Sequence, residues 1–250
     1  MTSDTTVTAC LLLIGNEILS GRTKDANLSW LAEALGAAGI RLREARVIPD
    51  DPEEIVAAVN HCRARYDHVF TTGGIGPTHD DITAGCIARA FGVPLERNAD
   101  AIGRLERHYN DPSKLNEARL KMAEIPVGAS LIDNPVSAAP GFTLENVHVL
   151  PGVPKIMQAM AEGLIKTLKG GRVMLSRTLV CRIMEGTVAE TLGRVQAAHP
   201  DVEIGSYPYM SPNNAGVSLV FRCDDAAKLE LAVAAMEGEL KALDTEYRVE

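Results

Sequence analysis

The chain has 250 residues, of which 46% are hydrophobic and 23% are charged, and its formal net charge is −8. This length suits one large domain or two modest ones, and the balance is that of an ordinary globular protein. The negative charge argues against non-specific binding to nucleic acid or to an anionic membrane surface. If the ligand is a small molecule with phosphate groups, local backbone dipoles or a metal must then hold those groups.

The sequence carries no targeting or membrane signal that we recognise. The polar N-terminus has no cationic segment before an apolar core, and the longest strongly apolar run, residues 9–14, is too short to span a bilayer. The five cysteines are scattered without a C-x-x-C pair. This pattern favours a reduced, cytoplasmic setting and argues against a cysteine-based zinc site.

The first elements in chain order are a buried strand at residues 7–14 and a turn at Gly15. Open α/β sheets place ligands at the carboxyl ends of their strands, so Asn16 and Glu17 are candidates to face a ligand; a solvated turn is the alternative. Asn27 then has the residue type of an N-cap for a helix that ends at Gly39. A second strand is expected at residues 42–48.

Residues 51–54, Asp-Pro-Glu-Glu, are typical of a helix start. Asp51 can cap the helix, Pro52 suits its first position, and Glu54 completes a pattern like a capping box. Asp50 is not needed for this cap. It is a spare carboxylate at the end of a strand and hence a candidate site residue, with an exposed loop acid as the alternative.

The central motif is T-T-G-G-I-G-P-T-H-D-D-I-T at residues 71–83. It follows a short apolar strand that includes residues 68–70 and precedes a helical pattern that ends at Gly92. Glycines between a strand and a helix start present backbone N–H groups to an anion. The motif is neither a Walker A loop nor a dinucleotide-binding fingerprint.

Two carboxylates, Asp80 and Asp81, stand where the first turn of that helix begins. Helix capping is one interpretation. Adjacent acids beside a phosphate site would repel the ligand unless a divalent cation lies between them, and oxygen ligands suit Mg²⁺ or a similar ion. His79 is a candidate proton donor or ligand contact, with a plain loop residue as the alternative.

The rest of the first part alternates helices and strands. Helices are expected at residues 98–109 and 113–122, an irregular segment at 124–142, and a strand at 147–150, followed by a tight turn and another helix. This alternation predicts a mostly parallel sheet with helices on both faces, in a domain of residues 1–169.

Residues 170–250 have a different order of elements. We expect a strand at 175–183, a helix from Thr187 with Glu190 in a capping box, strands at 202–210 and 215–222 joined by a hairpin-type turn, and a last helix with an apolar stripe. This is a small α+β domain of βαββα type. Since it lacks the G-x-x-G loop with which similar modules clamp RNA, we expect it to pack against a second subunit or the first domain.

Five motifs occur in an order that resembles a known family: G-N-E-I-L-S-G at 15–21, I-P-D-D at 48–51, the central motif, A-P-G-F at 139–142 and L-P-G-V-P at 150–154. The family is the CinA N-terminal (competence/damage-inducible protein A) family, in the molybdopterin-binding superfamily of MogA and MoaB. The resemblance covers about residues 7–168. The remaining tail is similar to the KH-type dimerisation module that follows this domain in CinA proteins.

The resemblance implies a three-layer α/β/α fold, a homo-oligomer and a metal-dependent pyrophosphatase acting on ADP-ribose; a related FAD synthase domain resembles an FAD hydrolase. It matches Asp81 to the superfamily's essential acid and Asp50 to a second acid, so both are expected to be catalytic. Together with Asp80, whose place beside Asp81 was noted above, they are expected to bind the metal, which would be Mg²⁺, Mn²⁺ or Co²⁺. The positions expected to bind phosphate or the rest of the ligand are Gly73, Gly74, Gly76, Pro77, Thr78, His79, Asn16, Glu17, Pro140, Gly141, Pro151 and Gly152.

Two departures from the family pattern leave alternatives open. Asn16 stands where the family often has Asp, and Ile156 stands where an acid is common after the P-G-V-P turn. A non-catalytic molybdopterin- or nucleotide-binding protein is therefore one alternative. A molybdopterin adenylyltransferase of the MogA kind is another.

Overall fold

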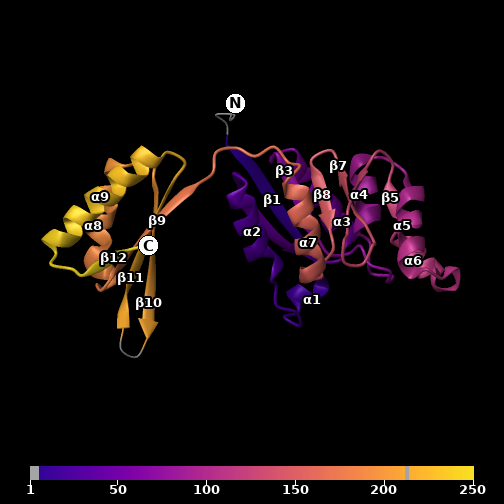
Figure 1. Cartoon of the computed structure of the whole chain (residues 1–250), viewed down its shortest axis with the longest axis horizontal. Coiled ribbons are helices and arrows are strands. Elements are labelled where there is room, and N and C mark those ends of the chain that lie inside the picture. The colour runs from indigo at the N-terminus through magenta and orange to yellow at the C-terminus, as the bar shows by residue number, and fades with distance from the viewer. Residues whose placement is uncertain (1–5, 212–213) are drawn as a thin grey trace. The chain divides into compact units, whose positions relative to one another are not determined.

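The computed structural model of the chain describes residues 6–211 and 214–250. The chain divides into two compact units, one that ends at Arg172 and one that begins at Val173 (Figure 1). Core residues of the larger unit form two clusters, and those of the smaller unit form a third. Because each unit has a core of its own, each is described by itself.

The larger unit is built on a sheet that has six strands within the described residues, in the order β2-β1-β3-β8-β7-β6. The first four strands run parallel to one another. At one edge of the sheet β7 pairs antiparallel with β8, and β6 pairs antiparallel with β7. The predicted α/β class with a mostly parallel sheet is confirmed. The strands are β1 (Val7–Ile14), β2 (Ile40–Ile48), β3 (His68–Thr72), β6 (Ser130–Ile132), β7 (Gly141–Leu144) and β8 (Val147–Leu150).

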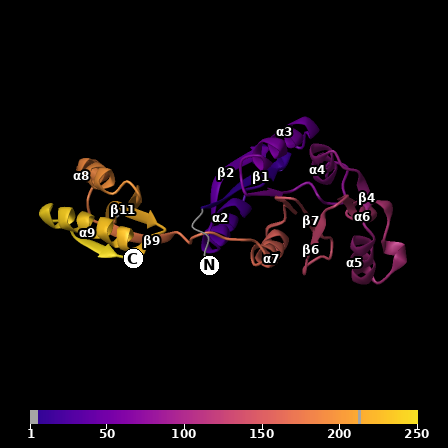
Figure 2. The same ribbon diagram turned by 90° about the horizontal axis from the view of Figure 1, so that it is seen from above.

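Helices cover both faces of this sheet (Figure 2). Successive side chains of a strand point to opposite faces, so β1 contributes to two cores. Its Leu12 packs in the cluster that includes α3 and α4, whereas Leu11 packs in the cluster that includes α2 and α7. Burial of each leucine contributes about 1.5–3 kcal/mol. The helices are α2 (Asn27–Ala37), α3 (Pro52–Arg63), α4 (Thr83–Phe91) and α7 (Pro154–Ile165).

Short elements complete the larger unit and correct two expectations. The helix expected at 113–122 is interrupted, because the Asn116 side chain accepts a hydrogen bond from the Arg119 backbone N–H and starts a separate helix there. The segment expected to be irregular, 124–142, contains two short strands and the start of a third. The elements are α1 (Asn16–Leu19), β4 (Leu95–Arg97), α5 (Ala99–Tyr109), a 3₁₀ turn (Pro112–Lys114), α6 (Glu117–Lys121) and β5 (Glu124–Pro126), with β4 and β5 paired.

Helix caps show which local predictions hold. Asp51 caps α3 as predicted, since its side chain accepts hydrogen bonds from the backbone N–H groups of Glu53 and Glu54. The cap predicted at Asn27 is wrong. The Asp25 carboxylate accepts from the backbone N–H of Asn27, and α2 already includes Asn27. The Asn27 side chain is thereby left for a contact with a distant turn, described below.

The smaller unit is an antiparallel sheet in the order β10-β11-β9-β12 with two helices. Alternate residues of β11, Val217, Leu219 and Phe221, are fully buried in the same core as the apolar stripe of α9. The predicted βαββα order is present, and β12 is an addition that the sequence pattern did not predict. The elements are β9 (Leu175–Cys181), α8 (Glu185–Ala198), β10 (Glu203–Ser211), β11 (Asn214–Cys223), α9 (Ala226–Ala242) and β12 (Tyr247–Val249).

The predicted start of α8 is wrong. The helix begins at Glu185 rather than Thr187, and Glu190 forms an ion pair with Arg194 one turn further on instead of closing a capping box. Of the turn expected at 211–214, positions 212 and 213 lie outside the described residues. Among the helices that the structure describes, none has both the length and the apolar character needed to cross a bilayer.

Candidate functional site

The loop between β3 and α4 has a backbone path that only glycine allows at its start. Gly73 and Gly74 have φ angles of +104° and +68°. A Cβ atom at Gly73 would lie 2.1 Å from the Ile14 carbonyl oxygen, and one at Gly74 would lie 2.2 Å from Thr83 Oγ1. The loop therefore passes too close to the end of β1 and to α4 for any side chain at these positions.

Thr83 closes the loop. Its buried hydroxyl donates to the Gly73 carbonyl oxygen at 3.0 Å, and its backbone N–H donates to the Gly74 carbonyl oxygen at 3.0 Å. These two bonds join the end of β3 to the first turn of α4. The intervening residues are thus held as a loop of fixed shape rather than as a flexible connection.

Asp81 does not cap the helix that follows it. Its Oδ2 accepts a hydrogen bond from the Thr78 backbone N–H at 2.8 Å and another from the Thr78 hydroxyl. Among the described side chains none caps α4, whose N-cap position is Ile82. The capping interpretation of the two acids is therefore wrong, and Asp81 is held inside the loop by Thr78.

The neighbours of Asp81 are more exposed. Pro77, Thr78, His79 and Asp80 all lie on the surface of the loop. Hydrogen bonding within the loop lowers the pKa of Asp80 below its usual range. Asp80 is thus fully ionised at neutral pH and accessible from solvent.

A pocket of about 230 Å³ opens beside this loop. Polar groups at its wall are Asp81, Lys121 and Glu124, and Lys121 donates a hydrogen bond to the Thr78 carbonyl oxygen. Its other walls are mostly apolar or backbone: Gly74, Ile75, Gly76, Ile82, Ala84, Gly85, Leu95, Met122, Ile125, Pro140 and Phe142. Two carboxylates and an ammonium group at the edge of an apolar slot suit a ligand with a flat ring and a charged tail.

Lys121 was not among the predicted site residues. It lies in the last turn of α6, 43 positions beyond Thr78, and no local motif marks it. A lysine at a helix C-terminus is also a common favourable pairing with the helix dipole, so its residue type gives no functional signal. Only the packing of α6 near the loop reveals its position.

The second group of predicted residues lies at the ends of β1, β2 and β8. The Asp50 carboxylate accepts a hydrogen bond from the Asn16 backbone N–H at 2.8 Å, and it thereby ties the end of β2 to the start of α1. A Cβ atom built at Gly152 would lie 3.4 Å from Gly73 Cα, which is ordinary van der Waals contact. The turn after β8 and the loop after β3 are therefore neighbours.

Asn27 holds this second turn. Its side-chain amide donates to the Gly152 carbonyl oxygen at 2.9 Å, although 125 positions separate the two residues. Its Oδ1 is buried and has no hydrogen-bond partner among the described residues. A small cavity of about 50 Å³ adjoins it, with Glu17, Lys24 and Thr72 among its lining residues. This polar crevice lies between the ends of β1 and β3, where the strand order reverses and where α/β sheets bind ligands.

The predicted residues are thus distributed over two adjoining places. Gly74, Gly76, Asp81 and Pro140 line the loop pocket, and Glu17 and Gly152 line the crevice. Gly141 lets β7 pack closely against β8, since a Cβ atom there would lie 2.3 Å from the Val149 carbonyl oxygen. Pro151 is half-buried in the turn after β8.

The three predicted metal-binding acids do not form a compact cluster. Within residues 6–211 and 214–250, the one group of three potential ligands whose atoms all lie within 4.8 Å of one another is elsewhere in the larger unit. Asp50 is engaged with the Asn16 backbone and Asp81 with Thr78. A cage made of Asp50, Asp80 and Asp81 together does not fit this arrangement, whereas a cation held by Asp81 and by a ligand's phosphates does.

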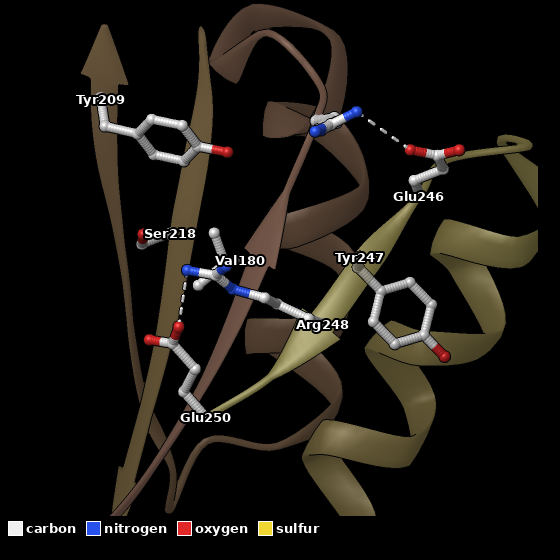
Figure 3. Close-up of a pocket in the computed structure, with 8 residues that line it drawn as sticks. Val180, Tyr209, Ser218, Glu246, Tyr247, Arg248 and Glu250 are labelled. Atoms are coloured by element: carbon white, nitrogen blue, oxygen red, sulfur yellow. Dashed lines mark hydrogen bonds and ion pairs between the residues drawn. The ribbon is translucent and has the colours of Figure 1, made fainter. Parts of the chain in front are cut away.

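A different hollow lies on the sheet of the smaller unit and measures about 480 Å³. Figure 3 shows Tyr209 and Arg248 beside it, with Arg248 paired to Glu250 at 2.7 Å. A second pair joins Arg182 and Glu246 at 3.4 Å. Because these four charges are paired with each other at the surface, the hollow offers no concentrated charge for a ligand.

The sequence of each unit matches a known protein family. Residues 10–170 match the family described as "probable molybdopterin binding domain", and residues 173–248 match "FAD synthase, middle domain". Protein TK1472 of Thermococcus kodakarensis is 35% identical over 243 residues, which are 91% of this chain and 95% of that protein. The CinA-like protein of Desulfosudis oleivorans is 39% identical over 207 residues, which are 78% of this chain and 50% of that protein.

Among solved structures, the protein CinA of unknown function from Thermoplasma acidophilum is 36% identical to this chain. Its TM-score is 0.61, and the match covers 66% of this chain and 98% of that one. The family match covers more than half of the chain and includes the glycine loop, Asp81 and the turn after β8. The chain therefore belongs to the probable molybdopterin-binding domain family, as a CinA-like member that also carries a domain of the FAD synthase middle type.

Proposed function

We propose that this chain is a cytoplasmic, divalent-cation-dependent pyrophosphatase that hydrolyses a nucleotide diphosphate such as ADP-ribose or FAD. The observation that carries the proposal is the position of Asp81. Its carboxylate is held by Thr78 at the wall of a pocket, and it does not serve as a helix cap. A fixed carboxylate beside a glycine loop suits an oxygen-ligated cation shared with phosphates.

The residues of the site have separable tasks in this proposal. The backbone of Gly74 and Gly76 forms the part of the pocket wall that phosphate oxygens would approach. Asp81 would hold the cation, which when bound supplies Lewis-acid polarisation of the diphosphate. Lys121, at the same wall, would neutralise further phosphate charge, and the apolar walls would receive a ring of the ligand.

The turn after β8 would orient the other end of the ligand. Asn27 holds that turn through the Gly152 carbonyl, and its unpartnered Oδ1 is available to accept a hydrogen bond in the crevice. We propose that the smaller unit serves in homo-oligomerisation and that the chain binds neither nucleic acid nor membrane.

Hydrolysis of ADP-ribose and FAD by the purified chain, in the presence of Mg²⁺, Mn²⁺ or Co²⁺, tests the proposal. We expect turnover that stops when EDTA is added. Asp81→Asn should lower kcat/KM by about 100-fold or more, because a cation in such a site supplies several kcal/mol of transition-state stabilisation. Glu162→Gln, which removes an exposed carboxylate of α7, should leave the rate unchanged.

Absence of product with each of the three metals would refute the pyrophosphatase. Asn16, which replaces an acid common in the family, favours a second function, a non-catalytic pterin or nucleotide binder. In that case calorimetry should show affinity for the ligand that persists in EDTA, with no product. Adenylylation of molybdopterin by ATP would instead identify an adenylyltransferase.

A further inference from the structure

Two cysteines that are far apart in the sequence meet beneath α3. Cys10 lies on β1 and Cys62 near the end of α3, and both side chains are fully buried. Their Sγ atoms are 3.2 Å apart. The contact joins the sheet to the helix that covers it.

A carboxylate completes this cluster. Glu44 on β2 is the register partner of Cys10, at a point where the pairing of β1 and β2 shifts between Ala9 and Cys10. Ligand atoms of Cys10, Glu44 and Cys62 all lie within 4.8 Å of one another. Irregular strand pairing of this kind often re-aims a side chain toward a site.

The surroundings of Glu44 fix its position. Its Oε2 accepts a hydrogen bond from the Tyr66 hydroxyl at 2.6 Å, and its Oε1 is paired with Arg46 Nε at 2.5 Å. Glu44 and Arg46 are about three-quarters and two-thirds buried, with side-chain exposures of 26% and 32%. Metal ligands commonly have such second partners, which orient them.

We propose that Cys10, Glu44 and Cys62 form a binding site for a thiophilic divalent cation of the zinc class. Two thiolates and a carboxylate carry three negative charges and Arg46 carries one positive charge, so a divalent cation leaves the group neutral. Thiolate sulfur with one oxygen ligand suits Zn²⁺ better than Mg²⁺ or Ca²⁺. A water molecule would be the fourth ligand.

The required rearrangement is small. Tetrahedral zinc–thiolate bonds of about 2.3 Å place two sulfur atoms about 3.8 Å apart, so the thiols, now 3.2 Å apart, must separate by roughly 0.6 Å. The cation would then join β1, β2 and α3, and its role would be structural rather than part of the ligand site.

Titration of the reduced, chelator-treated protein with Co²⁺ tests the site. We expect one ion per chain that gives the near-ultraviolet absorption of cobalt–thiolate bonds and the visible bands of tetrahedral cobalt, and that Zn²⁺ displaces. Because thiolates are formed on binding, protons should be released to the solution. An ion at Asp81 has only oxygen ligands and gives no thiolate absorption, so this result is separate from the proposed hydrolysis.

Variants assign the ligands. Cys10→Ser and Cys62→Ser should each abolish the thiolate absorption, whereas Cys86→Ser, which replaces a buried cysteine outside the cluster, should retain it. Tyr66→Phe should weaken binding by about 10–100-fold, as loss of an orienting partner does. Asp81→Asn should not affect the cobalt spectrum.

The native protein gives a measurement that does not depend on whether a variant folds. Elemental analysis of the reduced wild-type chain after incubation with Zn²⁺ and desalting should find about one zinc per chain. Blocking of both thiols by an alkylating agent in mild denaturant should release that zinc. Lack of cobalt–thiolate absorption in the wild type, or an unchanged spectrum in the serine variants, would overturn the proposal.

Discussion

Asp81 shows how one residue can be placed by its neighbour rather than by its helix. Thr78 donates both its backbone N–H and its hydroxyl to one carboxylate oxygen, and Gly76 leaves the space in which that oxygen lies. A Cβ atom at position 76 would be 2.7 Å from Asp81 Oδ2. The position of the carboxylate therefore depends on a missing side chain five residues earlier.

Gly76→Ala should thus displace Asp81 without disturbing the fold. The φ angle of Gly76 lies outside the left-handed region, so alanine is strained only through this contact. We expect kcat/KM for the proposed hydrolysis to fall by at least about tenfold, because misplacement of a catalytic group by a fraction of an ångström is costly.

Thermal unfolding and kinetics together check this prediction. The melting temperature should change by no more than a few degrees. Gly163→Ala is the matched control: no described atom lies within 4 Å of an added Cβ in α7, and alanine there should stabilise the helix by about 0.5–1 kcal/mol with full activity. Equal losses in both variants would show that Gly76 has no special role.

At the scale of elements, β3 and β8 share a pair of histidines, of which His148 is buried and His68 is half-buried. His148 Nε2 lies 3.1 Å from His68 Nδ1, and His148 Nδ1 lies 3.0 Å from the Thr143 hydroxyl. Burial, and secondarily the nearby His68, lowers the pKa of His148 to about 3. Burial likewise lowers the pKa of His68. The pair is therefore neutral in the folded protein at physiological pH.

Acid should destabilise the larger unit through this pair. The unfolded chain binds protons at histidine as pH falls through about 6.5, while folded His148 binds one only near 3, so stability falls across that window. For His148 alone, the free energy of unfolding should drop by about 2 kcal/mol between pH 7 and pH 5.

Denaturant titrations at pH 7 and pH 5 measure this slope. Glutamine cannot be protonated, so in His148→Gln the drop in the free energy of unfolding between pH 7 and pH 5 should be smaller by about 2 kcal/mol. The stability of this variant at pH 7 should also fall. His108→Gln, at an exposed position of α5, should keep the full slope. An unaltered slope in His148→Gln would assign the acid sensitivity to other groups.

Some elements could be predicted because their signals are local. The continuous apolar run of β1 matches its bounds, and Asp51 with Pro52 marks the start of α3 correctly. Predictions from local sequence failed where a side chain bonds to a residue far away in the chain. Asn27 has the residue type of a cap, but its side chain binds Gly152, 125 residues away. Strands β5 and β6 have three residues each, too few to show a periodic pattern.

The candidate site likewise has parts that local sequence predicts and parts that it does not. The glycine loop was evident from its composition, and the structure explains it by the contacts of Gly73 and Gly74. Lys121 and the pairing of Cys10 with Cys62 could not be foreseen, because they depend on packing between elements that are 43 and 52 positions apart. The expectation that the scattered cysteines exclude a metal site rested on sequence spacing alone.

At the scale of the whole molecule, the two units have separate cores, so damage to one should leave the other intact. Phe221 is fully buried in the core of the smaller unit. Phe221→Ala should lower the stability of that unit by about 3–5 kcal/mol. The proposed ligand site of the larger unit, including Asp81, should keep the affinity and rate of the proposed hydrolysis per folded chain.

Differential scanning calorimetry checks this separation. We expect the transition of the smaller unit to shift to lower temperature while that of the larger unit stays in place. Phe142 lies in the core of the larger unit beside the loop pocket. Phe142→Ala should shift the transition of the larger unit to lower temperature and leave that of the smaller unit in place. A single transition that shifts as a whole in both variants would show that the units unfold together.

The tight path of the glycine loop has a consequence for how ligand preference can change in this family of folds. A side chain at Gly73 would lie 2.1 Å from the Ile14 carbonyl oxygen, and one at Gly74 would lie 2.2 Å from Thr83 Oγ1, so these positions cannot vary without breaking the loop. The side chains that can vary without that penalty are those on the apolar wall, such as Leu95 and Met122. Selection for a new substrate, in nature or in the laboratory, should therefore accumulate changes on that wall, with the glycine loop inherited unchanged.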